Sequence, residues 1–222
     1  MMNDADDILV SLEGIDFTGK STAVRRLGRE LSQIGVRALL TRDPPNIEPW
    51  LGLKKTVFDR KTHVSAPAEA LLFLTARVDN AMRRIRPALR EGRIVIADRF
   101  SDSWVAYWAP KLSSNFGSLA ASLAWLTDLD RTLCRFNFLV HPTKTYLLVD
   151  DPDAAVRRAP NKRRSKWETP AFLKQVQKAY LKLTKIDPDR FTIFDIRKLG
   201  ISEAIDELVD DAVYFIGQHV QV

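Results

Sequence analysis

The sequence predicts an α/β protein built around a parallel sheet. Short apolar segments rich in β-branched residues alternate with longer segments of helical period, and strands joined by helical crossovers produce this alternation. The first of these segments, residues 8–12, is almost continuously apolar, as expected for a strand covered by helices on both faces. A length of 222 residues, 45% of them apolar, suffices for one core, so we expect a single domain over residues 1–222.

Local signals place each element in chain order. Apolar residues recur at helical spacing from Lys20 to Gln33, and Gly35 follows, which is typical of a helix that ends at a glycine. Pro67 suits the first turn of a long helix, and Pro87 predicts a kink within that helix. The predicted strands cover residues 8–12, 36–41, 93–98, 146–149 and 191–196, and the predicted helices cover residues 20–33, 67–92, 119–136, 171–183 and 202–216.

The charge balance indicates an anionic partner. There are 34 Lys and Arg residues and 28 Asp and Glu residues, which leaves a net charge of +6. Such a balance suits phosphate, a nucleotide, a nucleic acid or an acidic membrane surface. Residues 157–166 hold six basic residues and no acidic one, so the excess is local and the rest of the chain is balanced. A local excess favours one anionic ligand over a surface that binds nucleic acid.

The cysteine, the histidines and the N-terminal residues argue against a disulfide-stabilised, zinc-stabilised, secreted or membrane-spanning protein. The single cysteine, Cys134, cannot form an intrachain disulfide, and His63, His141 and His219 show no spacing of a structural zinc site. The N-terminal residues are acidic where a secretory signal is basic, and no apolar run approaches the roughly 18 residues that span a bilayer. We therefore expect a soluble, cytoplasmic protein without a membrane partner.

The strongest functional signal is a glycine-rich segment between the first predicted strand and the first predicted helix. Residues 14–21, GIDFTGKS, match the pattern G-x-x-x-x-G-K-[ST]. The glycines let backbone N–H groups surround a phosphate, Lys20 reaches the outer phosphates of a nucleotide, and the Ser21 hydroxyl is a magnesium ligand. The predicted ATP-binding residues are Gly14, Ile15, Asp16, Phe17, Thr18, Gly19, Lys20, Ser21 and Thr22.

A second polar pair ends the third predicted strand, where Arg99 follows Asp98. Ligands of open α/β sheets collect at the carboxyl ends of the strands, so this pair faces the phosphate loop if the first and third strands are neighbours. The carboxylate can hold magnesium directly or through water, and the guanidinium can bind a second phosphate through two hydrogen bonds. A strand-end ion pair without a ligand is the alternative.

A set of ordered motifs extends over nearly the whole chain: residues 12–16 (LEGID), 41–44 (TRDP), 71–77 (LLFLTAR), 85–89 (IRPAL) and 98–107 (DRFSDSWVAY). In this order they resemble the motifs of the thymidylate kinase family. The resemblance implies a three-layer P-loop NTPase fold, with a five-stranded parallel sheet flanked by helices and a short lid. It also implies a homodimer that transfers the γ-phosphoryl group of ATP to dTMP with Mg²⁺.

Position by position, the resemblance implies roles in the acceptor site. Arg42 and Arg99 would bind the acceptor phosphate. Phe73 would stack on the thymine, Arg77 would donate to a base carbonyl, and Tyr107 would lie against the deoxyribose. Phe73 and Arg77 are four positions apart on a predicted helix and therefore share a face, although a core phenylalanine beside a solvated arginine is the alternative. The predicted sets are Asp16, Arg42, Phe73, Arg77, Arg99, Ser103 and Tyr107 for the substrate, Ser21 and Asp98 for the metal, and Lys20, Asp16 and Arg99 for catalysis.

A basic segment follows the fourth predicted strand and matches the position of the family's lid over ATP, at about residues 151–168. Some members of the family carry a catalytic arginine inside the phosphate loop, but residues 15–18 hold none here. The lid must then supply this charge, and the catalytic candidates are Arg157, Arg158, Arg163 and Arg164. A solvated basic loop, or a nucleic-acid contact in a non-catalytic binding protein, is the alternative.

The implied chemistry needs no general base. A nucleoside monophosphate has a second pKa near ~6, so its attacking oxygen is already anionic at neutral pH, and catalysis reduces to alignment and charge neutralisation. A deoxynucleoside would need a carboxylate to accept the proton of its hydroxyl. Kinases of that kind typically carry Glu-Arg-Ser where this chain has Asp98-Arg99-Phe100. A guanine-nucleotide switch is also unsupported, because Asn161-Lys162 does not continue as Asn-Lys-x-Asp.

Departures from the family pattern affect the expected base specificity. Residues 43–46 read DPPN instead of EPGG, Trp108-Ala109 replaces Gln-Gly, and residues 165–168 read SKWE instead of DRxE. Trp108 either reshapes the base pocket or belongs to the core. A kinase for another deoxynucleoside monophosphate, or for a deoxynucleoside, therefore remains an alternative.

Overall fold

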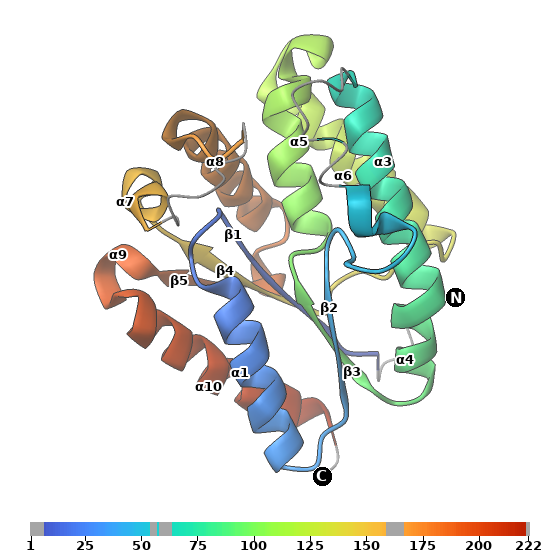
Figure 1. Ribbon diagram of the computed structural model, residues 1–222, viewed down its shortest axis with the longest axis vertical. Helices are drawn as coiled ribbons and strands as arrows, with labels where there is room; N and C mark the ends of the chain where they lie inside the picture. The colour runs from blue at the N-terminus through green and yellow to red at the C-terminus, as the bar shows by residue number, and fades with distance from the viewer. Residues whose placement is uncertain (1–6, 54–56, 58–63, 159–166, 221–222) are drawn as a thin grey trace.

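A parallel sheet of five strands forms the middle of the protein (Figure 1). The structure is a computed structural model that describes residues 7–53, 57, 64–158 and 167–220. The strand order is β2-β3-β1-β4-β5, with bounds β1 Leu9–Gly14, β2 Ala38–Arg42, β3 Ile94–Asp98, β4 Lys144–Val149 and β5 Phe191–Asp195. The predicted fold class and the predicted strands are confirmed, and the strand ends differ from the prediction by at most two residues.

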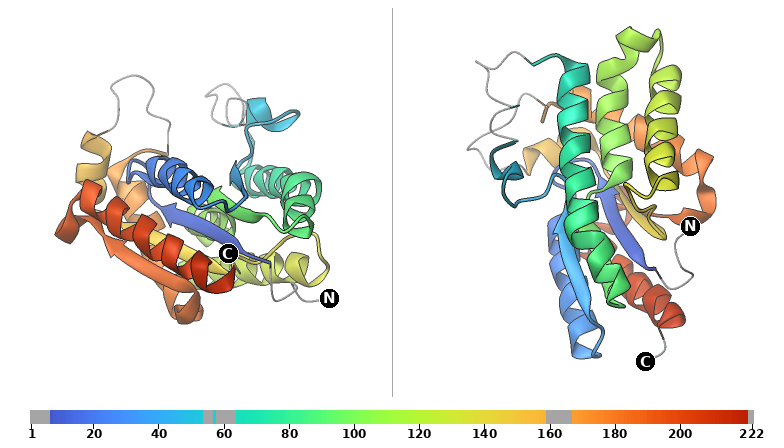
Figure 2. Two further views of the ribbon diagram at one scale, coloured as in Figure 1. Left: turned by 90° about the horizontal axis from the view of Figure 1, so that it is seen from below. Right: turned by 90° about the vertical axis from the view of Figure 1, so that its right-hand side faces the viewer.

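Helices cover both faces of the sheet, which makes three layers (Figure 2). One face carries α1 (Lys20–Gln33), α9 (Ile196–Leu199) and α10 (Ile201–His219), whose apolar side chains pack on the strands. On the other face α5 packs against α3, α6 and α8. The helices of this side are α3 Ala66–Asn80, α4 Arg86–Arg90, α5 Ser101–Phe116, α6 Leu119–Arg135 and α8 Pro170–Ile186. None of the described helices combines the length and the apolar character needed to cross a membrane.

The predicted helix over residues 67–92 is divided in the structure. It consists of α3, a π-helical turn (η2, Ala81–Ile85) and α4. A proline has no N–H to donate, and its ring displaces the carbonyl four residues earlier, so the irregular turn falls just before Pro87.

Three described α-helices were not predicted: α5, α7 (Pro152–Arg157) and α9. α5 is buried on most of its surface, including the polar residues Ser101, Asp102 and Ser103 of its first turn. A helix buried in this way shows no apolar stripe, so the periodicity on which the prediction depends is absent.

The strand order brings the predicted site residues to one edge. β1 lies between β3 and β4, with Leu12 opposite Asp98 and Gly14 opposite Leu148. The first and third strands are therefore neighbours, as the prediction for Asp98 and Arg99 requires. Their carboxyl ends meet where the phosphate loop leaves β1.

Candidate active site

The phosphate loop joins β1 to α1 in a conformation that requires glycine at both of its fixed glycine positions. Gly14 has φ 136°, and a Cβ there would lie 2.4 Å from the backbone oxygen of Leu148. Gly19 has φ 88° and immediately precedes α1. Residues with side chains rarely adopt such positive φ angles. The loop can therefore fold over the helix N-terminus, whose free N–H groups attract an anion.

Lys20 begins α1 and directs its side chain under the loop. Its Nζ donates to the Ile15 carbonyl at 2.5 Å and to Thr18 Oγ1 at 3.1 Å, and the residue is 5% exposed. Burial, followed by repulsion from Arg99, lowers the pKa of the Lys20 ammonium to about 7. A phosphate in the loop would raise this pKa again, because a nearby anion favours the charged form.

Arg99 lies between the phosphate loop and α5. Its Nη1 donates to the Gly14 carbonyl at 2.8 Å and to Ser103 Oγ at 3.2 Å. Its Nη2 donates to Asp16 Oδ1 at 2.8 Å and to the Tyr107 hydroxyl at 3.1 Å, and that hydroxyl donates to Asp16 Oδ2 at 2.6 Å. The guanidinium also lies over the Tyr107 ring, with Cζ 4.9 Å from the centroid. The planar group is thus held in one orientation from several sides.

Glu13 and Tyr180 support this arrangement, and sequence reasoning selected neither of them. Glu13 Oε1 accepts from the N–H of Phe100 at 2.8 Å, and its Oε2 accepts from Ser103 Oγ and, at 3.1 Å, from the Tyr180 hydroxyl. Burial, followed by repulsion from Asp102, raises the pKa of Glu13 to about 7. An acidic residue inside an apolar strand could have indicated Glu13. Tyr180 is 167 residues away from it and carries no comparable signal.

The two predicted metal ligands are in contact near the carboxyl ends of β1 and β3. Ser21, on α1, donates through Oγ to Asp98 Oδ2 at 2.5 Å, next to the phosphate loop. Hydroxyl and carboxylate oxygens are the ligands that Mg²⁺ prefers in proteins. The donor set therefore fits the ion that the sequence predicts.

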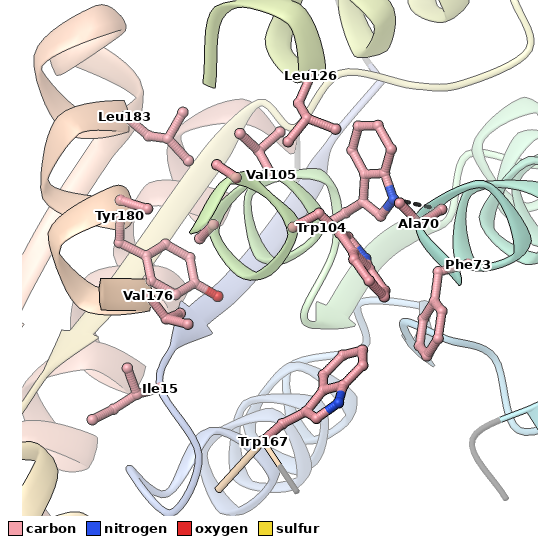
Figure 3. Packing of buried hydrophobic residues seen from close by; sticks show 14 of the residues in the cluster. Ile15, Ala70, Phe73, Trp104, Val105, Leu126, Trp167, Val176, Tyr180 and Leu183 are labelled. Atoms are coloured by element: carbon pink, nitrogen blue, oxygen red, sulfur yellow. Dashed lines mark hydrogen bonds between the residues drawn. The ribbon is translucent and has the colours of Figure 1, made fainter. Parts of the chain in front are cut away.

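A cavity of about 110 Å³ opens beside Arg99. Its lining includes the polar residues Asp16, Arg99 and Ser103 and the aromatic residues Phe73 and Trp108. The ring centroids of Phe73 and Trp108 are 5.5 Å apart, and Trp167 meets Trp108 edge-on at 4.9 Å. Figure 3 shows Phe73 of α3 and Trp167, which precedes α8, close to each other. Trp108 is 2% exposed and lines the cavity as well, so it belongs to both the core and the pocket wall.

Comparisons of the sequence with known proteins identify the family. The family profile of thymidylate kinase matches residues 12–208. A probable thymidylate kinase from Methanoculleus marisnigri is 37% identical over 191 residues, which cover 85% of this chain and 86% of the relative. The chain belongs to the thymidylate kinase family. A probable thymidylate kinase from Thermococcus gammatolerans is 32% identical over 96% of this chain and 97% of its own length, and the thymidylate kinase from Symbiobacterium thermophilum is 30% identical over 92% and 90%.

Within this thymidylate kinase fold, Arg77 is held behind the cavity wall. It has no exposed surface, its Nη2 donates to Asp130 Oδ1 at 3.0 Å, and its Nη1 lies 3.8 Å from Asp43 Oδ2. Its Cζ is 4.8 Å from the Trp104 ring centroid. A solvated arginine, the alternative left open for this position, is therefore wrong, because two carboxylates and an aromatic face enclose it. Its hydrogen bond to a base stays a prediction.

The remaining predicted arginines differ in position. Arg42 ends β2 at the carboxyl edge of the sheet and is exposed. Arg157, at the end of α7, is also exposed, whereas Arg158 contacts Asp150 Oδ2 and donates to the Phe17 carbonyl of the phosphate loop at 3.5 Å. Arg163 and Arg164 lie outside the described residues. Of the lid candidates that the structure describes, Arg158 is thus the one beside the loop.

Proposed function

We propose that this protein transfers the γ-phosphoryl group of ATP to dTMP and releases ADP and dTDP. The observation that carries the proposal is the cavity that joins Asp16 and Arg99, beside the phosphate loop, to the aromatic side chains of Phe73 and Trp108. A nucleoside monophosphate carries a charged phosphate, which suits Arg99, and a flat base, which suits the aromatic side chains. The names of the relatives, which are thymidylate kinases or probable thymidylate kinases, support the same substrate.

The reaction depends on charge and alignment. The attacking oxygen belongs to a phosphate that is already ionised, so no residue has to remove a proton. Arg99 is held at the loop by the Gly14 carbonyl, Asp16 and Ser103, and it would bind the acceptor phosphate by exchanging some of these hydrogen bonds for phosphate oxygens. Lys20 would neutralise charge on the outer phosphates of ATP. The Tyr107 hydroxyl donates a hydrogen bond to Asp16, and the Tyr107 side chain would form one wall of the position that the sugar occupies.

Two further groups complete the proposed machinery. Ser21 and Asp98 would hold Mg²⁺, which when bound neutralises negative charge on the β- and γ-phosphates. Arg158, already in contact with the Phe17 carbonyl, would turn from Asp150 toward the transferring phosphoryl group. Asp150 follows β4, whose carboxyl end lies at the same edge of the sheet as the phosphate loop.

A panel of acceptors tests the proposal. ADP release is measured in a coupled assay with dTMP, dUMP, dCMP, dAMP, dGMP and thymidine at equal concentrations, and we expect the highest kcat/KM for dTMP. A preference for thymidine would favour the deoxynucleoside alternative, and a preference for another monophosphate would assign a different base. Absence of turnover with every acceptor, together with a salt-sensitive gel shift on DNA, would favour a nucleic-acid-binding protein and contradict the kinase.

Nucleotide binding is expected to become proton-linked above pH 7. The pKa of Lys20 in the free protein is about 7, so its amine is mostly neutral at higher pH. A polyphosphate favours the ammonium form, so binding takes up a proton and the affinity for ATP falls as the pH rises. Calorimetry in two buffers of different ionisation enthalpy measures this uptake. The Lys20→Arg variant, whose guanidinium stays charged, is expected to show none, and equal heats for the wild type in both buffers would contradict the assignment.

The family resemblance also leads us to propose a homodimer, formed through the outer face of α3. Leu71 on α3 and Met82 after it are 48% and 46% exposed, and they are three helical turns apart on the same side. Figure 2 shows α3 on the outside of the molecule. We expect the Leu71→Glu, Met82→Glu double variant to sediment as a monomer, whereas Leu181→Glu, at an exposed position of α8, stays dimeric. A monomeric wild type at micromolar concentration would contradict this interface.

A further inference from the structure

A second cluster of reactive side chains lies away from the phosphate loop, where α6 approaches the segment that leads to β4. Asp130 and Cys134 are four residues apart on α6, so they share one face of the helix. His141 joins them from the segment between α6 and β4. A carboxylate oxygen, the Cys134 sulfur and a ring nitrogen of His141 all lie within 4.8 Å of one another. Carboxylate, thiolate and imidazole are the ligands that Zn²⁺ takes in proteins.

His141 has the support that metal-binding histidines usually have. Its Nε2 lies 3.5 Å from Asp187 Oδ2, and Asp187 in turn accepts a hydrogen bond from Arg190 Nε at 2.9 Å. A carboxylate on one ring nitrogen fixes the tautomer and the orientation of the ring, and it leaves the other nitrogen for a cation. With Nε2 on Asp187, Nδ1 is the ring nitrogen left for the cation.

An adjoining cavity of about 30 Å³ contains an unsatisfied donor. Asp130, His141 and Ser101 are among its lining residues. Ser101 is 3% exposed, and its Oγ has no hydrogen-bond partner among the described residues. A buried hydroxyl without a partner is costly, and a space of this size holds one water molecule. The cavity therefore has room for the water that would complete a four-coordinate site.

The surrounding charges leave one oxygen of Asp130 available to a cation. Arg77 binds Oδ1, whereas Oδ2 is the oxygen nearest to Cys134, at 4.0 Å from its sulfur. Arg190 is neutralised by Asp102 and Asp187. A cation on Oδ2 can thus be bound while Arg77 keeps its hydrogen bond to Oδ1.

We propose that Asp130, Cys134 and His141 bind one thiophilic divalent cation of the Zn²⁺ type, with water as the fourth ligand and Asp187 as the positioning residue for His141. The site differs from the Ser21–Asp98 pair, whose hard oxygen donors suit Mg²⁺. It connects α6 to the segment before β4, and through Asp130 it steadies the buried guanidinium of Arg77. The spacing of these residues in the sequence is not that of a zinc motif, and only the fold brings them together.

Cobalt titration of the full-length, reduced, metal-free protein tests the site without reference to kinase activity. We expect saturation at one Co²⁺ per chain, with a thiolate-to-cobalt charge-transfer band in the near ultraviolet and ligand-field bands of a four-coordinate ion, and displacement by Zn²⁺. Cys134→Ser is expected to remove the charge-transfer band. Asp187→Asn should weaken binding by about 10- to 100-fold while the band persists, as expected for a residue that orients a ligand.

Controls separate the site from adventitious binding. His219→Gln and His63→Gln alter the other histidines of the chain and are expected to leave the titration unchanged. His141→Gln should weaken binding strongly, and Zn²⁺ should raise the Tm of the wild type but not of this variant. Circular dichroism of each metal-free variant shows whether it is folded. Absence of the charge-transfer band at equimolar Co²⁺, or a band that is unchanged in His141→Gln, would overturn the proposal.

Discussion

Replacing Lys20 by alanine is expected to lower kcat by about 100- to 1000-fold, the typical cost of removing one preorganised donor from a developing negative charge. In the free protein the ammonium is buried against the Ile15 carbonyl and Thr18 Oγ1, so it is already positioned where the outer phosphates of a nucleotide would lie. A shorter, uncharged side chain leaves the outer phosphates without this cation. Initial rates at saturating ATP and dTMP measure the effect.

The matched control for this change is Lys182→Ala. Lys182 is an exposed residue of α8, and its removal is expected to leave kcat unchanged. Thermal unfolding of both variants shows that the fold persists; we expect Lys20→Ala to be at least as stable as the wild type, because it removes a buried cation. Turnover of Lys20→Ala close to that of the wild type would show that the loop does not act on the nucleotide in the proposed way.

Arg99→Lys is expected to lower kcat/KM for dTMP by about 100- to 1000-fold, because lysine keeps the charge but loses the planar, bidentate geometry. Arg99 contacts the Gly14 carbonyl, Asp16, Ser103 and Tyr107 together, and a single ammonium cannot reach all four groups at these positions. The Tyr107 hydroxyl and Asp16 would then lose the hydrogen bonds that the guanidinium donates to them. We expect both a higher KM for dTMP and a lower kcat, whereas KM for ATP should change less.

The control for Arg99→Lys is Arg90→Lys, at an exposed position of α4 remote from the loop. It is expected to retain wild-type kinetics. If Arg99→Lys raised KM for ATP while KM for dTMP stayed constant, Arg99 would serve the donor side, and the acceptor site would have to be placed elsewhere.

Much of the site could be predicted because its signals are local. The glycines, Lys20 and Ser21 lie within one turn between a strand and a helix, and each needs only neighbouring residues to take its conformation. Asp98 and Arg99 could be predicted for the same reason, since the end of an apolar strand is visible in the sequence. α5 could not be predicted, because a helix buried on most of its surface lacks the apolar and polar alternation of a surface helix.

Other residues gained their roles only through long-range packing. Glu13 meets Tyr180 and Ser103 because α5 and α8 pack together over the end of β1, and no spacing in the sequence encodes that contact. Arg77 shares a face with Phe73, as the spacing predicts, yet only the packing of α6 places Asp130 beside it. The same packing brings His141 to Cys134.

Sequence patterns alone were enough to identify the alternation of strands and helices, the phosphate loop, the family and the local excess of positive charge at residues 157–166. These depend on interactions between residues a few positions apart, which spacing and propensity report directly. The folded chain was needed to show which distant side chains share a site: the Glu13–Ser103–Tyr180 group beside Arg99, the aromatic residues around Trp108 and the Asp130–Cys134–His141 cluster. Such contacts arise when helices bury their faces against a common sheet, and the position of each face depends on every other element of the fold.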